Sequence, residues 1–176
     1  MRIDVTCLNT TKPRWVNKND LLDRVMKSVG DFTSVFADIE MENLPTSEYV
    51  VEQDNFMTAI VGFEGACSGV AWARCSESFA ELMAIRMRRV DLSCVEDAKR
   101  AAMIDMITLL GGDIRLLFSP ANKDIRLSEI SVYKADEFDC SGIIENPANL
   151  RCQFRHSNEH LYVGVMLGKN VQKHRD

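Results

Sequence analysis

Residues 150–167, LRCQFRHSNEHLYVGVML, decide the fold class, because apolar and polar side chains alternate along them. The apolar members of the two halves are Leu150, Cys152 and Phe154, then Leu161, Val163, Val165 and Leu167. This alternation is typical of strands that have one face on a core and the other in water. Residues 157–159 between the halves are short enough for a hairpin turn. The stretch therefore predicts an antiparallel sheet.

The rest of the chain predicts further strands and the helices that cover them. The additional strands expected are residues 49–53, 56–63, 68–75 and about 126–132. The helices expected start at Asn19 or Asp20, at Ser76 or Ser78, and at Ser93, and the last of them runs to about Phe118. The apolar stripe of the first helix is Leu22, Val25, Met26, Val29, Phe32 and Phe36.

Strands that occur in runs, with helices between the runs, predict an α+β fold in two layers. The expected order is α-βββ-αα-βββ, with long helices packed on a largely antiparallel six-stranded sheet. A chain of 176 residues has the usual size of one domain, and no linker or repeat divides it. We therefore expect a single domain over residues 1–176.

Composition excludes several classes of protein. Hydrophobic residues make up 46% and charged residues 27%, as in an ordinary globular protein. The net charge of −5 argues against binding to nucleic acid or anionic lipid. The first twelve residues lack a signal-peptide core, and charged residues interrupt the most apolar stretch, residues 101–118. We expect a cytoplasmic protein without a membrane or nucleic-acid partner.

Three local patterns invite a chemical interpretation that their context disfavours. The six cysteines include no C-x-x-C pair, which favours reduced thiols over a disulfide or zinc framework. Cys152, His156 and His160 are spaced by four, but they lie on a predicted hairpin, where that spacing does not gather metal ligands. The glycines of GFEGACSG, residues 62–69, lie between two predicted strands and lack a lysine, which indicates a hairpin turn rather than a phosphate loop.

The last predicted helix carries the most information about function. With Met106 at the centre of its buried face, small side chains line a flanking stripe that another surface could approach closely. That stripe is Ala101, Asp105, Thr108 and Gly112. An acid and a hydroxyl three residues apart could pair with a partner's lysine and position a water molecule. The alternative interpretation is structural, with a solvated aspartate and a threonine that bonds back to the helix carbonyls.

The chain resembles the CheC, CheX and FliY family of chemotaxis phosphatases, and most of all its CheX branch. The resemblance rests on the glycine turn, on the order of the helices and on the segment DMITLLGGD, residues 105–113, and it covers roughly residues 20–168. It implies a CheC-like fold and a phosphorylated CheY-type receiver as partner, in chemotaxis or two-component signalling. It also implies that the protein needs no cofactor of its own, because the receiver supplies Mg²⁺.

In that family the matching helix carries Glu-x-x-Asn, whose acid pairs with the receiver's lysine and whose amide orients the attacking water. The acid falls on Asp105 and the amide on Thr108, so the chain departs from the pattern at both positions. It departs again at Asp113, where the family often has asparagine. Aspartate keeps the charge, and threonine keeps a hydroxyl that can accept and donate. Asp-x-x-Thr also resembles the arrangement in phosphatase-competent sensor histidine kinases. The implied catalytic residues are Asp105 and Thr108, on a docking stripe with Ala101 and Gly112.

Two functions remain open at this point. The first is a phosphatase that accelerates dephosphorylation of the receiver's aspartate. The alternative is a non-catalytic receiver-binding or scaffolding module whose motif is degenerate. CheX-like proteins are typically dimers, and the final hairpin is expected to leave an apolar strand at the sheet edge, so we expect a two-fold homodimer. The eight acidic residues between positions 31 and 65, where no Lys or Arg occurs, indicate a solvated face.

Overall fold

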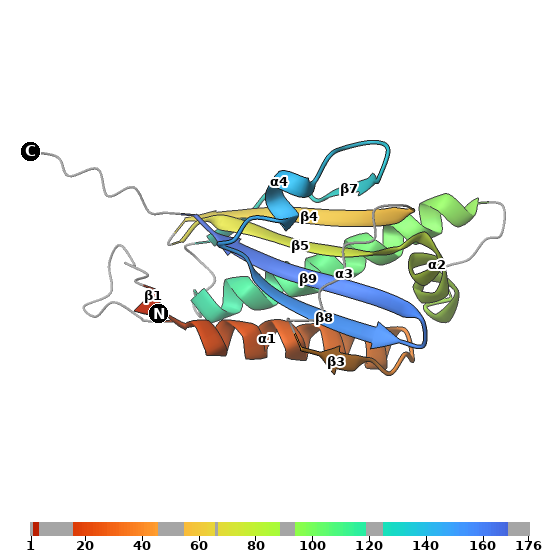
Figure 1. Cartoon of the computed structure of the whole chain (residues 1–176), viewed down its shortest axis with the longest axis horizontal. Coiled ribbons are helices and arrows are strands. Elements are labelled where there is room, and N and C mark those ends of the chain that lie inside the picture. Colours follow the sequence, from red (N-terminus) through yellow and green to blue (C-terminus); the bar gives the residue numbers. More distant parts are fainter. Residues whose placement is uncertain are drawn as a thin grey trace, which may run out of the picture.

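The computed structural model of the chain describes residues 2–3, 16–45, 55–65, 67–88, 94–118 and 125–168 (Figure 1). The helices are α1 (Lys18–Asp31), the π-helix η1 (Phe32–Phe36), α2 (Glu77–Arg86), α3 (Val95–Phe118) and α4 (Ser141–Ile144). The strands are β1 (Arg2–Ile3), β2 (Val16–Asn17), β3 (Glu42–Leu44), β4 (Phe56–Gly65), β5 (Gly69–Ser76), β6 (Ile125–Leu127), β7 (Ser131–Lys134), β8 (Leu150–His156) and β9 (Glu159–Leu167). These elements confirm an α+β fold.

The main sheet has seven strands within the described part of the chain, one more than predicted. Its order is β3-β8-β9-β5-β4-β6, with β7 also paired to β4, and every pairing is antiparallel. The predicted strands at 56–63, 68–75 and 150–167 are confirmed as β4, β5 and the hairpin β8–β9. The strand predicted at 49–53 lies outside the described residues. The short strand β3 and a separate pair, β1–β2, were not predicted.

The strand predicted at 126–132 is wrong in one respect, because the chain divides there into β6 and β7. Both strands pair with β4, but Ser128 between them leaves the regular ladder. The backbone N–H of Ser128 donates to the Gly62 carbonyl at 2.8 Å, and the Ser128 hydroxyl accepts from the Gly62 N–H at 2.8 Å. A side chain that takes the place of a backbone partner interrupts a strand without detaching it.

The final hairpin does not end the sheet, contrary to the prediction. β9 pairs with both β8 and β5, and β8 pairs with β3 on its other side. Alternation along a strand shows which face is buried but not where the strand lies in the sheet. The homodimer stays a prediction, and it no longer has the support of an exposed edge on this hairpin.

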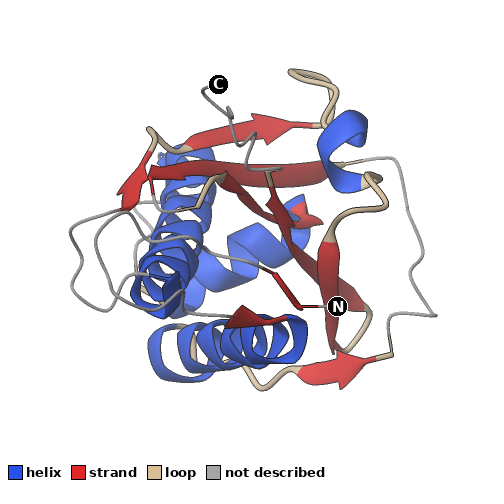
Figure 2. Ribbon diagram, turned by 90° about the vertical axis from the view of Figure 1, so that its left-hand side faces the viewer, coloured by secondary structure: helices blue, strands red, loops and turns tan. Residues whose placement is uncertain are grey.

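The two faces of the sheet carry cores of different size. Alternate residues of β4, such as Met57, Ala59 and Val61, belong to the large core that the long helices complete. Trp72 belongs to a smaller core on the other face, together with residues of α4. Figure 2 shows the long helices on one side of the strands and the short helix α4 on the other. A Cβ on Gly164 would lie 2.4 Å from the Trp72 ring, so only glycine fits opposite this indole.

The first helix follows its predicted stripe until its last turn. Val25, Val29 and Phe32 are buried, whereas Phe36 is 55% exposed. The difference arises because the chain continues as the π-helix η1, whose wider turn shifts the phase of the side chains. Next to this change, the Thr33 hydroxyl donates to the Val29 carbonyl at 3.0 Å. The stripe therefore ends at Phe32, and Phe36 faces the solvent.

The two central helices begin close to their predicted starts, and α3 ends at Phe118 as predicted. Ser76 caps α2, since its side-chain oxygen accepts from the Phe79 N–H at 3.1 Å. The capping box that starts at Ser93 lies outside the described residues. Met106 is 2% exposed, which confirms it on the buried face of α3. Within the described ranges, no helix is both long enough and apolar enough to cross a membrane.

Candidate functional site

Helix α3 lies under the centre of the sheet and leaves one face open to solvent. It packs on β4 and β5 and is flanked by α1 and α2. Ala102 and Leu110 on its buried side are 0% and 1% exposed. On its outer side, exposed positions recur every four residues at Ile104 and Thr108, and Leu116 follows two turns further on. Thr108 therefore lies near the middle of the face that α3 exposes to solvent.

The four residues of the predicted docking stripe differ in exposure. Thr108 is exposed, while Ala101, Asp105 and Gly112 are half-buried. A Cβ added at Gly112 would meet nothing within 4 Å, so the surface around this position is open. The stripe is thus exposed at Thr108 and only partly accessible at its other three positions.

Asp105 and Thr108 line the same groove. Its volume is about 270 Å³, and its remaining walls are the apolar side chains Phe32, Phe36, Met87 and Leu109. The walls come from η1, from the residue that follows α2 and from the middle of α3. The structure therefore brings the predicted pair together at one wall of an apolar groove, and the apolar walls were not predicted.

The hydroxyl of Thr108 is held in one orientation by the helix. It donates to the Ile104 carbonyl at 2.6 Å. A hydroxyl has a single proton and two lone pairs, so the Thr108 oxygen remains an acceptor toward a molecule on the outside of α3. This is the back-bonded threonine of the structural interpretation, and it is also a fixed acceptor next to a carboxylate.

Asp113 lies in the segment that carries the resemblance, but it has a partner within the chain. Its carboxylate forms an ion pair with Arg24 of α1, and the Asp113 side chain is only 18% exposed. The pair joins α1 to α3 one and a half turns beyond Thr108. This geometry gives Asp113 a role in holding two helices together.

The structure does not bring Cys152, His156 and His160 together as a metal site. Cys152 is buried, and burial raises the pKa of its thiol to about 11. His156 Nδ1 lies 2.9 Å from the Glu40 carbonyl, and His160 Nδ1 lies 3.0 Å from Gln153 Nε2. Among the described residues, no three His, Cys, Asp or Glu side chains are grouped so as to hold a metal ion. None of the cysteines there forms a disulfide, namely Cys67, Cys75, Cys94, Cys140 and Cys152.

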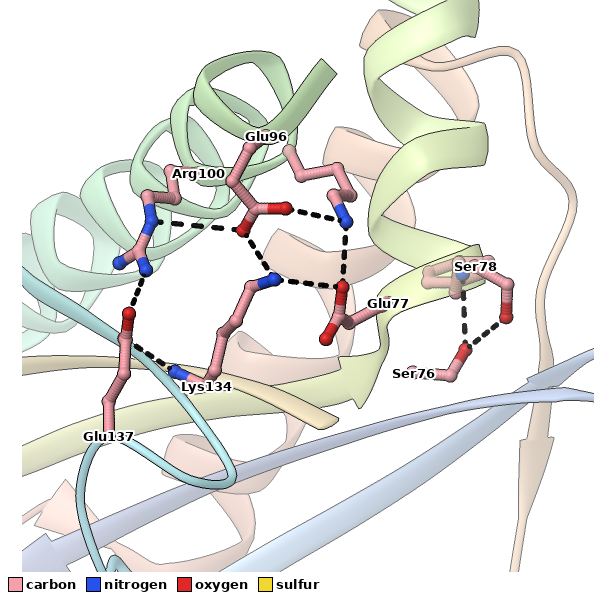
Figure 3. A network of polar contacts seen from close by, with 9 residues as sticks. Ser76, Glu77, Ser78, Glu96, Arg100, Lys134 and Glu137 are labelled. Carbon is pink, nitrogen blue, oxygen red and sulfur yellow. Dashed lines mark hydrogen bonds and ion pairs between the residues drawn. The ribbon is translucent and has the colours of Figure 1, made fainter. Parts of the chain in front are cut away.

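A network of charged side chains surrounds the start of α3, and it was not predicted from the sequence (Figure 3). Lys99 is 7% exposed and contacts Glu77 of α2 at 2.7 Å and Glu96 at 2.8 Å. Lys134 of β7 contacts the same two carboxylates at 3.2 and 3.0 Å. Arg100 extends the network to Glu137. Ion pairs between opposite charges therefore connect α2, α3 and β7.

The ion pairs shift the pKa values of the groups that form them. Hydrogen bonds from Lys99, and then from Lys134, lower the pKa of Glu77. Burial opposes ionisation of Glu96, but hydrogen bonds from the same two lysines outweigh it, and its pKa is also lowered. The pKa of Lys134 is raised, first by its hydrogen bond to Glu96. Every shift favours the charged forms, as expected of a network that stabilises the fold.

Comparison with known proteins finds matches to this chain by structure and none by sequence. No protein-family model matches it, and neither does any curated protein sequence. The chemotaxis protein CheX from Desulfovibrio desulfuricans matches with a TM-score of 0.65 at 14% identity, over 85% of this chain and 99% of that one. CheX from Vibrio vulnificus matches with a TM-score of 0.68 at 9% identity, over 87% and 99% of the two chains.

A third match is to a structure that contains a partner. CheX from Borrelia burgdorferi, solved in a complex with CheY, BeF3 and Mg²⁺, has a TM-score of 0.64 at 12% identity, over 84% of this chain and 97% of that one. CheC-like proteins and a FliY also match with a probability of 1.00. The chain therefore has the fold of the CheC, CheX and FliY chemotaxis proteins, as the sequence resemblance implied.

Proposed function

We propose that this protein is a phosphatase that removes the phosphoryl group from the aspartate of a CheY-type receiver. The observation that carries the proposal is the fixed acceptor oxygen of Thr108 next to the carboxylate of Asp105 on the open face of α3. A fold shared with CheX supports the choice of partner, since one CheX of this fold was solved together with CheY.

In the proposed reaction, a water molecule attacks the phosphorus of the receiver's acyl phosphate. The water oxygen forms a bond to phosphorus, the bond between phosphorus and the aspartate oxygen breaks, and the receiver's carboxylate leaves with the electron pair. Inorganic phosphate and a proton are the other products. Thr108 accepts a hydrogen bond from the water, and this bond orients a lone pair of the water oxygen toward phosphorus. Phosphoryl transfer depends mainly on such positioning and on charge neutralisation.

Asp105 has a different task in this proposal. Its carboxylate pairs with the lysine of the receiver site and holds the two proteins in register. Mg²⁺ belongs to the receiver, where it neutralises charge on the phosphoryl group, and this chain contributes no metal ligand. Loss of Asp105 is therefore expected to weaken both binding and the reaction, whereas loss of Thr108 affects the reaction alone.

A second candidate function is a receiver-binding module without catalysis. The observation that favours it is again the hydrogen bond from Thr108 to Ile104, since a threonine with no catalytic role makes the same bond inside a helix. In this case the groove and the carboxylate would serve contact only. Binding is common to the two candidates, and the rate of dephosphorylation separates them.

The test follows the decay of CheY-type receivers from the same organism after phosphorylation with acetyl phosphate. Thr108→Val keeps the shape of the side chain and removes the acceptor, so we expect a rate loss of about 10² to 10⁴ at saturating protein with receiver binding unchanged. Thr108→Ser keeps the acceptor and is expected to retain most of the rate. If wild type binds a receiver without accelerating decay while Thr108→Asn does accelerate it, the binding module is the correct function.

A further inference from the structure

Large apolar side chains are unusually exposed on the elements that border the groove. Val35 and Phe36 of η1 are 73% and 55% exposed, Ile85 of α2 is 50% exposed, and Ile104 of α3 is 39% exposed. Single exposed apolar residues are normal on a protein surface, but a gathering of several indicates a contact surface. Of these four side chains, Phe36 lines the groove with Asp105 and Thr108, and the other three lie on the elements that border it.

The size of the groove limits what can occupy it. A closed cavity of about 150 Å³ is enough to bind a benzene molecule. The volume here is about 270 Å³, and the walls are Phe32, Phe36, Met87 and Leu109, with Asp105 and Thr108 at one side. That space suits one large aliphatic or aromatic side chain of a partner and is too small for a helix.

Charged groups of both signs border the groove. The Asp38 side chain is 93% exposed and lies 3.8 Å from Arg86 of α2. Arg86 and Arg88 are exposed on either side of Met87, which is one wall of the groove. Asp31, which precedes η1, has a basic partner one turn back on α1. The border is therefore mixed in charge, and the selectivity of the groove comes from its apolar walls.

We propose that the groove binds an apolar side chain of the phosphorylated receiver, and that Phe36 determines the affinity. The inference rests on the proposed function, because the groove is continuous with the Asp105–Thr108 pair and the same partner must cover both. Phe36 is not a catalytic residue. It provides apolar area that leaves water only when the receiver is docked.

The test compares two phenylalanines of similar exposure. Phe36→Ala removes the wall of the groove, and Phe138→Ala removes a ring that is 48% exposed on the segment between β7 and α4, away from the groove. We expect Phe36→Ala to raise the Kd for the phosphorylated receiver, and its KM, by about tenfold or more, as truncation of an aromatic anchor does. The rate at saturation should remain within about twofold of wild type, and Phe138→Ala should change neither quantity.

A second variant controls for local loss of structure in Phe36→Ala, because the Phe36 ring stacks on Phe32 with the ring centroids 5.8 Å apart. Met87→Ala acts from another wall of the groove and should raise the Kd in the same direction, with an unchanged circular dichroism spectrum. A Kd unchanged in both variants, while wild type binds and dephosphorylates the receiver, would overturn the inference and leave the proposed function intact. If wild type binds no phosphorylated receiver, the proposed function itself is wrong.

Discussion

The start and the middle of helix α3 differ in whether their polar side chains have partners within the fold or lie beside an open apolar groove. At its start, Glu96, Lys99 and Arg100 find their partners within the chain, on α2, β7 and the turn that follows β7. In its middle, Asp105 and Thr108 line a groove whose other walls are apolar and open. Charges that neutralise one another stabilise a fold, whereas a polar pair beside exposed apolar area is suited to a partner. This difference separates the residues of α3 that stabilise the fold from the two that we propose to act on a receiver.

The largest loss of stability is expected when both lysines of the charged network around the start of α3, Lys99 and Lys134, are replaced. Lys99→Met should lower the free energy of unfolding by about 1–2 kcal/mol, because each glutamate still has Lys134 and some access to water. The double variant Lys99→Met, Lys134→Met leaves Glu77 and Glu96 close together without a lysine, so its loss should exceed the sum of the two single losses. Urea unfolding measures all three variants.

The same variants test whether the start of α3 is purely structural. Lys99→Met should leave the rate of receiver dephosphorylation at saturation unchanged, whereas Thr108→Val should leave the urea midpoint unchanged. A rate loss in Lys99→Met at a temperature where the variant is folded would contradict the division of α3 into two parts.

The pH dependence of stability provides a finer test of the network. The folded pKa values of Glu77 and Glu96 lie below the ordinary 4.5, so the stabilisation is fully present above about 4.5 and is lost as the pH falls through the lowered values. Lys99 and Lys134 have raised pKa values, so their contribution is fully present below 10.5 and is lost only above it. Between these limits the network should be insensitive to pH.

Lys99→Met supplies the control for this dependence. Without Lys99 the pKa values of both glutamates move back toward 4.5, so the acid-induced loss of stability should become shallower than in wild type. Parallel urea titrations between about pH 3 and pH 7 compare the two proteins. Identical slopes below pH 4.5 would show that the network does not govern acid stability.

The sequence predicted the parts of this molecule that depend on local pattern. Alternation in residues 150–167 identified β8 and β9, and the spacing around Met106 identified the buried face of α3. The position of the hairpin inside the sheet and the division at Ser128 depend on pairing between distant strands, which local pattern does not contain. The exposure of Phe36 follows from a π-helix, whose phase differs from that of the α-helix assumed for the stripe.

The candidate site shows the same limit. Asp105 and Thr108 could be selected from spacing and resemblance, because both lie on one helix. The apolar walls could not, since Phe36 and Met87 reach the groove from elements that are distant in sequence. The ion pairs of Lys99 were hidden for the same reason, because Glu77 and Lys134 belong to other elements. The charged residues at positions 96, 97, 99 and 100 mark the network in the sequence, but they do not identify its partners on other elements.

Apart from its control, the smallest expected effect belongs to Asp113, which tests the comparison at the far end of α3. Asp113→Asn keeps the size of the side chain and removes the charge that pairs with Arg24. The two side chains are 18% and 35% exposed, so we expect a loss of about 0.5–1 kcal/mol, or about 1–4 °C in Tm, that shrinks as salt is added.

Asp31→Asn is the matched control, because its partner Lys27 lies one turn away on the same helix and the pair is 64% and 52% exposed. This variant should lose less than Asp113→Asn, since an exposed pair within one helix contributes little and joins no second element. The dephosphorylation rate should be unchanged in both variants. A rate loss in Asp113→Asn without a change in Tm would place Asp113 with Asp105 and Thr108, and the open part of α3 would then extend further along the helix than its exposure indicates.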